Sequence, residues 1–171
     1  MSSPLAGRFR AEPHVFVPVA VAALVRGLNL AFLAANDPLF RHPVADSWFH
    51  YHEGKLILDT GFLLPGIGAF YKGPLYSYIA AIMMALFGES GGVVVGRILS
   101  SALGCAAVYL VAVLAARYAG RGAAWTAGLT AALYGTAVYL DAALLDVSLV
   151  ATLLLGSALL LVRAEDEARP Q

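Results

Sequence analysis

The chain has 171 residues, of which 60% are apolar and only 13% are charged, and its formal net charge is zero. Together with a mean hydropathy of +0.77, these values are typical of integral membrane proteins and not of soluble domains. The balanced charge argues against a nucleic-acid-binding surface. The single cysteine, Cys105, excludes an intramolecular disulfide and a cysteine-based metal cluster.

Apolar segments that could form membrane helices follow one another along most of the chain. The first, 15–35, has 21 residues, enough to cross a hydrocarbon core of about 30 Å as a helix. The segment 74–88 has 15 residues and would extend only about 22 Å as a helix, which is short for a crossing. Three later segments reach spanning length: 93–117, 123–140 and 146–162.

Whether segment 74–88 crosses the membrane decides the topology. Basic residues favour the cytoplasmic side of a membrane, so their distribution can distinguish the two arrangements. If the segment does not cross, three basic residues lie outside (Arg41, Lys55 and Lys72) and six lie in the cytoplasm (Arg8, Arg10, Arg117, Arg121, Arg163 and Arg169). If it crosses, only two basic residues, Arg8 and Arg10, stay in the cytoplasm. The rule therefore favours four spans with both termini in the cytoplasm.

These arguments predict an all-α polytopic membrane helix bundle of about four transmembrane helices in the cell membrane. We expect a cytoplasmic N-terminus over 1–14, a membrane domain over 15–162 and a charged cytoplasmic tail over 163–171. An outer loop over 36–92 would contain interfacial helices. Small residues at helical spacing, such as Gly128 and Ala132, predict closely packed spans.

The outer loop carries the first candidate for chemistry, a stripe formed by Asp46, His50 and Glu53. Their i, i+4, i+7 spacing places them on one face of a helix. Asp46 beside an imidazole could act as a general base, or it could simply cap the N-terminus of the helix. His50 and His52 could join these acids as metal ligands, but a separation of two points them apart on a helix. The spacing favours solvated, interfacial roles for both histidines, and we predict no metal site.

Three basic residues lie where they could meet an anion or a buried acid. Lys72 precedes the helix start at Pro74 and could bind a lipid phosphate, or its ammonium could snorkel to water. Arg97, near the outer end of its span, could serve the same anionic group. Arg26 lies deeper in the first span, where a charge usually faces the protein interior, and we interpret it as a structural ion-pair partner.

The order of these features resembles the N-terminal part of the GT-C membrane glycosyltransferases, the family that includes the protein O-mannosyltransferases and the aminoarabinose transferases of lipid A. The resembling stretches are, in order, one span, PVADSWFHYHEGKLI, FYKGPLYSYIAAIMMALFG, VGRILSSALGCAAVYLVAVLAARYAGRGAAWTAGLTAALYG and YLDAALLDVSLVATLLL. They cover nearly all of the chain from about residue 19 onward. Family members are far longer, so the resemblance indicates a partial module, a truncated form or a chain that needs further membrane subunits.

The resemblance implies transfer of a sugar from a polyprenyl-phosphate donor to a glycan, lipid or protein acceptor at the outer membrane face. Asp46 would match the catalytic acid that takes the acceptor proton, and Lys72 a lysine at the donor phosphate, with Arg97 assisting. Asp146 would match a second outer-loop acid, which in some relatives holds a metal or the acceptor. The resemblance therefore allows a divalent metal, although Ser47 follows Asp46 where some relatives have a second acid. The alternative is a non-catalytic binding or assembly protein derived from such a module.

Overall fold

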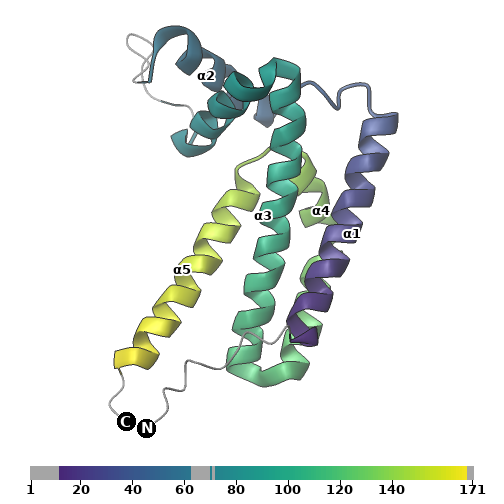
Figure 1. The fold of residues 1–171 in the computed structure, drawn as a ribbon, viewed down its shortest axis with the longest axis vertical. Helices are drawn as coiled ribbons and strands as arrows, with labels where there is room; N and C mark the ends of the chain where they lie inside the picture. Colours follow the sequence, from purple (N-terminus) through teal and green to yellow (C-terminus); the bar gives the residue numbers. More distant parts are fainter. Residues whose placement is uncertain (1–11, 63–69, 71, 169–171) are drawn as a thin grey trace.

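The computed structural model describes residues 12–62, 70 and 72–168, and within these ranges the regular structure is entirely helical. Five helices follow one another: α1 (Pro13–Asn36), α2 (Asp46–Thr60), α3 (Pro74–Leu133), α4 (Gly135–Ala142) and α5 (Val147–Ala168). Helices α1, α3 and α5 run side by side, and α2 lies at the end of the bundle opposite the start of α1 and the end of α5 (Figure 1). The expected all-α bundle is confirmed.

Helix α3 is interrupted twice, so its 60 residues form three segments. Gly88 and Gly120 have φ values of 73° and 79° with ψ near 180°, at 169° and −174°. Only glycine adopts this region of backbone space readily, because it lacks a Cβ. The chain therefore turns sharply at both points. The segment before Gly88 lies beside α2, and the segment after Gly120 returns, with α4, toward the same end (Figure 1).

The bundle has about four membrane passes, as the sequence predicts. Three helices, α1, α3 and α5, are long and apolar enough to cross a membrane. Because α3 turns at Gly120, its last segment and α4 together form a further pass, broken at the extended residue Tyr134. The short segment before Gly88 lies beside α2 and takes no part in these passes (Figure 1), and its interfacial position stays a prediction.

Helix α5 extends beyond the predicted span 146–162 and into the predicted tail. Helix α5 continues to Ala168 and does not end at 162. Arg117 on α3 forms an ion pair with Asp166 on α5, which joins the two helices at this end of the bundle. Part of the predicted tail is therefore helical. The remaining terminal residues of the two predicted cytoplasmic ends, 1–11 and 169–171, lie outside the described residues.

The centre of the bundle is packed from small residues. Ala22 of α1, Val108 and Ala132 of α3 form one buried cluster. A Cβ built on Gly128 would lie 2.9 Å from the Pro18 ring of α1 and 3.2 Å from the Cβ of Ala112. These distances are too short for a relaxed contact. Gly128 is therefore required for the close approach of α1 and the two segments of α3.

We expect Gly128→Ala to lower the free energy of unfolding by about 1–3 kcal/mol, because the added methyl group overpacks the contact with the rigid Pro18 ring. The measurement is denaturant unfolding in detergent micelles, followed by circular dichroism. The matched control is Gly156→Ala in α5, where an added Cβ meets no atom within 4 Å. Equal stability of the two variants would contradict this account of the packing.

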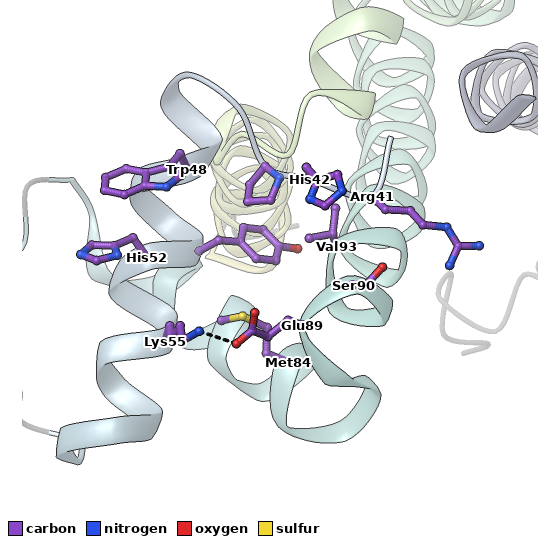
Figure 2. Close-up of a pocket in the computed structure, with 11 residues that line it drawn as sticks. Arg41, His42, Trp48, His52, Lys55, Met84, Glu89, Ser90 and Val93 are labelled. Carbon is purple, nitrogen blue, oxygen red and sulfur yellow. Dashed lines mark hydrogen bonds and ion pairs between the residues drawn. The ribbon is translucent and has the colours of Figure 1, made fainter. Parts of the chain in front are cut away.

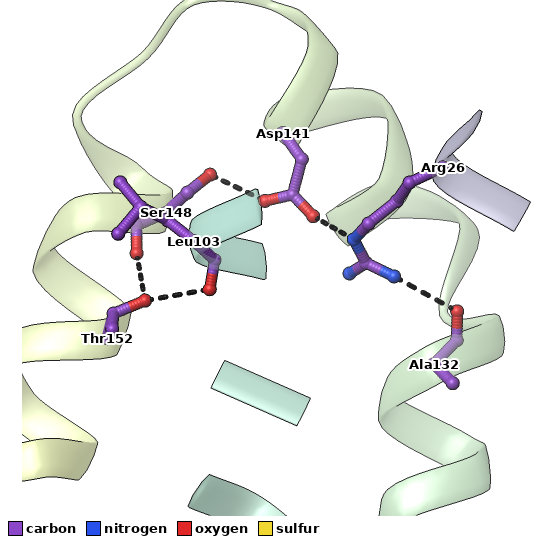
Figure 3. Close-up of polar contacts among 6 residues, drawn as sticks. All are labelled: Arg26, Leu103, Ala132, Asp141, Ser148 and Thr152. Carbon is purple, nitrogen blue, oxygen red and sulfur yellow. Dashed lines mark hydrogen bonds and ion pairs between the residues drawn. The ribbon is translucent and has the colours of Figure 1, made fainter. Parts of the chain in front are cut away.

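A buried polar network joins α1, α4 and α5 inside the bundle (Figure 3). The Arg26 Nε atom lies 2.7 Å from Oδ2 of Asp141, and both side chains are almost fully buried. The other Asp141 oxygen accepts a hydrogen bond from Ser148 Oγ at 2.5 Å. The interpretation of Arg26 as an ion-pair partner is confirmed. Asp141, which directly follows the predicted span 123–140, lies within α4 and is buried.

Candidate functional site

The two residues expected to carry the chemistry, Asp46 and Lys72, meet at the end of the bundle that holds α2. The Lys72 Nζ atom lies 3.0 Å from Oδ2 of Asp46. The Asp46 side chain is 66% exposed, whereas that of Lys72 is only 23% exposed. Asp46 starts α2, and Lys72 lies just before the first turn of α3. The fold therefore brings a proton acceptor and a cation together at an accessible position.

The capping interpretation of Asp46 is wrong. The residue at the N-cap of α2 is Ala45, and no side chain caps this helix end. Asp46 is instead the first helical residue, where its negative charge still favours the helix N-terminus. Ala45 has φ 50° and ψ −127°, a backbone region that favours glycine. This turn directs the chain into α2 immediately before the candidate base.

Behind Asp46, the stripe continues into a buried hydrogen-bonded network. Ser77 Oγ of α3 donates a hydrogen bond to Glu53 Oε2 at 2.7 Å and lies 3.3 Å from His50 Nδ1. The single hydroxyl proton of Ser77 is used by Glu53, so His50 must donate from Nδ1. The other ring nitrogen, Nε2, is buried and has no hydrogen-bond partner among the described residues. His50 is fully buried, which corrects the expected solvated role, whereas His52 is exposed.

The electrostatic surroundings of His50 connect it to the predicted acids. Burial lowers the pKa of His50 from its ordinary value, and the charge of Lys72 acts in the same direction. The charges of Asp146, Glu53 and Asp46 raise it. Among these charges that of Asp146, in the connection between α4 and α5, has the largest effect on the pKa of His50. His50 is therefore neutral near pH 7, within the field of three acids and one lysine.

Arg97 lies beside this group but is held by backbone carbonyls. Its Nε atom donates to the carbonyl of Phe40 at 2.9 Å, and its Nη1 atom donates to that of Ala142. The guanidinium also lies 5.0 Å from the centroid of the Phe40 ring. These contacts join the loop after α1 to the end of α4. Arg97 and Asp46 nevertheless line one cavity of about 280 Å³, so both groups face the same space.

The described residues contain no group of three or more histidine, cysteine or acidic side chains arranged to hold a metal ion. His50 and His52 point to different surroundings, as their separation along the helix predicts. His52 stacks on Trp48 with ring centroids 4.5 Å apart, while His50 packs its ring against Tyr76 at 4.9 Å. These two histidines therefore do not share a ligand position.

The sequence analysis missed Ser77 and Ser100. Ser77 links His50 to Glu53, and Ser100 Oγ lies 3.0 Å from the buried Tyr76 hydroxyl. The available signal was a hydroxyl residue within an otherwise apolar helix, since buried polar groups in a membrane protein need partners. That signal identifies neither partner, because each lies 24 or more residues away in the sequence.

The fold and site define a polytopic helical membrane protein with an acid and lysine pair at one end of the bundle. The family model described as dolichyl-phosphate-mannose-protein mannosyltransferase matches residues 71–171. This match covers more than half of the chain, and the chain belongs to this family of membrane glycosyltransferases. Lys72, Arg97 and Asp146 lie within the matched residues, and Asp46 lies before them. No curated protein and no solved structure matches the chain.

Proposed function

We propose that the protein transfers a sugar from a polyprenyl-phosphate donor to an acceptor hydroxyl. The observation that carries this proposal is the ion pair between Asp46 and Lys72, on a chain whose later part matches a glycosyltransferase family. A base for the acceptor and a cation for the donor phosphate are the two groups that such a transfer requires. The two groups form an ion pair of 3.0 Å, and Asp46 also lines a cavity.

In the proposed reaction, the Asp46 carboxylate takes the proton from the acceptor hydroxyl while the hydroxyl oxygen attacks the anomeric carbon. The bond between this carbon and the phosphate oxygen breaks, and its electron pair leaves with the polyprenyl phosphate. Lys72 stabilises the negative charge of this leaving group. A single displacement of this kind inverts the configuration at the anomeric carbon.

The ion pair observed between Asp46 and Lys72 suggests how the donor prepares the site. In this ion pair the ammonium group of Lys72 occupies one carboxylate oxygen of Asp46. A phosphate is a strong competitor for that ammonium group. Binding of the donor phosphate would therefore draw Lys72 away and release Asp46 as the base. Arg97, with further N–H donors on its guanidinium, lines the adjacent cavity and would support the phosphate. Asp146 would orient the acceptor.

We further propose that the site faces the outside of the cell membrane. The end of the bundle opposite α2 carries the paired basic residues Arg117 and Arg121, which contact Asp166 and Glu12. An excess of arginine and lysine favours the cytoplasmic side. The same rule supports cytoplasmic termini and an outward-facing α2. The donor sugar would then be used at the outer surface.

Lys72→Met tests the donor role of the lysine. We expect kcat/KM for transfer from dolichyl-phosphate mannose in lipid vesicles to fall about 100- to 1,000-fold, because the leaving phosphate loses its stabilising cation. Radiolabelled mannose appearing on an added acceptor mixture gives the rate. The matched control is Lys55→Met, which removes a lysine whose partner is Glu89 and not Asp46. A Lys72 variant as active as the Lys55 variant would contradict the assignment.

A further inference from the structure

A second polar cavity lies near α2, apart from the one that contains Asp46. Its volume is about 380 Å³, and it opens between the loop after α1, one face of α2 and the turn of α3 near Gly88 (Figure 2). Its lining and that of the cavity beside Asp46 share no residue. The proposed transfer reaction makes no use of this second cavity.

The floor of this cavity is built from buried side chains. Tyr51 of α2 is buried and donates a hydrogen bond from its hydroxyl to the Gly92 carbonyl at 3.0 Å. Met84 and Val93 pack with Tyr51 in one core cluster. An ion pair of 2.5 Å between Lys55 and Glu89 joins α2 to α3 across the cavity (Figure 2). These contacts fix the positions of the two helices that form the walls.

The ionisable residues around the cavity are mainly basic. Arg41, His42, His52 and Lys55 line it, against a single carboxylate, Glu89. Lys55 pairs with Glu89, and this contact raises the pKa of Lys55, which keeps its ammonium group charged. Arg41, at the rim, has no ion-pair or hydrogen-bond partner within the part of the chain that the structure describes. The cavity thus has an unpaired guanidinium and a net positive charge.

This chemistry favours an anion over a neutral sugar. A sugar site would use free carboxylates or amides for the hydroxyl groups, yet the one lining carboxylate is already paired. One face of the Trp48 ring is also covered by His52, which leaves less of it for stacking on a sugar. An arginine fork and the nearby Ser90 hydroxyl are suited to phosphate oxygens.

Apolar side chains on the α3 segment before Gly88, which also supplies Met84 to the cavity, indicate that the phosphate belongs to a lipid. Ile82, Leu86 and Phe87 precede the turn of α3 and expose 58%, 71% and 55% of their area. Trp48, 46% exposed at the cavity, is a residue type that gathers at membrane interfaces. We propose that this cavity binds the phosphate headgroup of an anionic membrane phospholipid, with the acyl chains lying along the apolar side chains before the turn.

Quenching of Trp48 fluorescence by brominated lipids tests this proposal. A Trp125→Phe background leaves Trp48 as the one tryptophan, since the chain has two. In phosphatidylcholine vesicles, a minor fraction of brominated phosphatidylglycerol should quench Trp48 more strongly than the same fraction of brominated phosphatidylcholine. Arg41→Gln should reduce this preference about fivefold, the effect of one basic residue near a charged membrane surface. Arg41 is exposed, so its replacement should not disturb folding.

Arg121→Gln is the matched control, because Arg121 is equally charged and exposed but lies near Glu12 at the other end of the bundle. It should leave the lipid preference unchanged. An equal loss of the lipid preference in both variants would show that the preference depends on net charge alone, and it would overturn the proposed lipid site. Equal quenching by the two lipids would also overturn it. Inorganic phosphate that abolishes the preference would indicate a site for free phosphate, and protection by mannose would indicate a sugar site; either result would overturn the lipid assignment.

Discussion

An Asp46→Asn variant should insert and fold normally but transfer sugar about 100- to 10,000-fold more slowly than the wild type, the usual range for loss of a general base. Asparagine keeps the shape of the side chain but has no carboxylate to take the acceptor proton. The Asp46 side chain is largely exposed, and an exposed ion pair contributes at most about 1 kcal/mol to stability. The loss should therefore appear in kcat and not in the amount of folded protein, as measured by radiolabel transfer and by gel filtration in detergent.

Asp59→Asn provides the control for this loss, because Asp59 is an exposed acid in the last turn of the same helix. It should transfer sugar at the wild-type rate. If Asp46→Asn were equally active, Asp46 would not be the base. The alternative, a non-catalytic assembly module of the same family, would then be favoured, and substitutions on the packed faces of the spans would be the informative changes.

The sequence predicts which residues of α2 share a face but not how deeply they are buried. The spacing of Asp46, His50 and Glu53 correctly identifies one stripe, because helical periodicity is a local property. Burial of His50 depends on Ser77 and Tyr76 of α3, more than 20 residues away in the sequence. No local pattern contains that contact. The solvated role expected for His50 is wrong for this reason.

The same distinction between local and distant information applies to the spans. Hydropathy locates the passes because lipid imposes a length on each membrane-spanning helix. The extended residue Tyr134, which separates α3 from α4, is not signalled by a proline or glycine at that position. The partner of Arg26 is likewise hidden, since Asp141 lies 115 residues away. The free-energy cost of placing a charge inside a membrane span indicates that Arg26 must have a partner, but it does not identify that partner.

Removing Asp141 should destabilise the protein more than any other single change considered for the bundle. Asp141→Ala leaves the buried Arg26 guanidinium without its ion-pair partner and removes the acceptor for Ser148. An uncompensated buried charge of this kind costs about 3–5 kcal/mol. The measurement is the free energy of unfolding in mixed micelles with increasing sodium dodecyl sulfate, followed by circular dichroism.

Asp166→Ala is the matched comparison, because its ion pair with Arg117 joins two helices in a similar way but at an exposed position. It should cost no more than about 1 kcal/mol. A double variant, Arg26→Met with Asp141→Asn, should recover much of the loss, since no buried charge is then left unpaired and the asparagine can still accept from Ser148. If the double variant were as unstable as Asp141→Ala, the cost would come from altered packing near Gly104, whose backbone lies against Asp141, and not from the unpaired guanidinium.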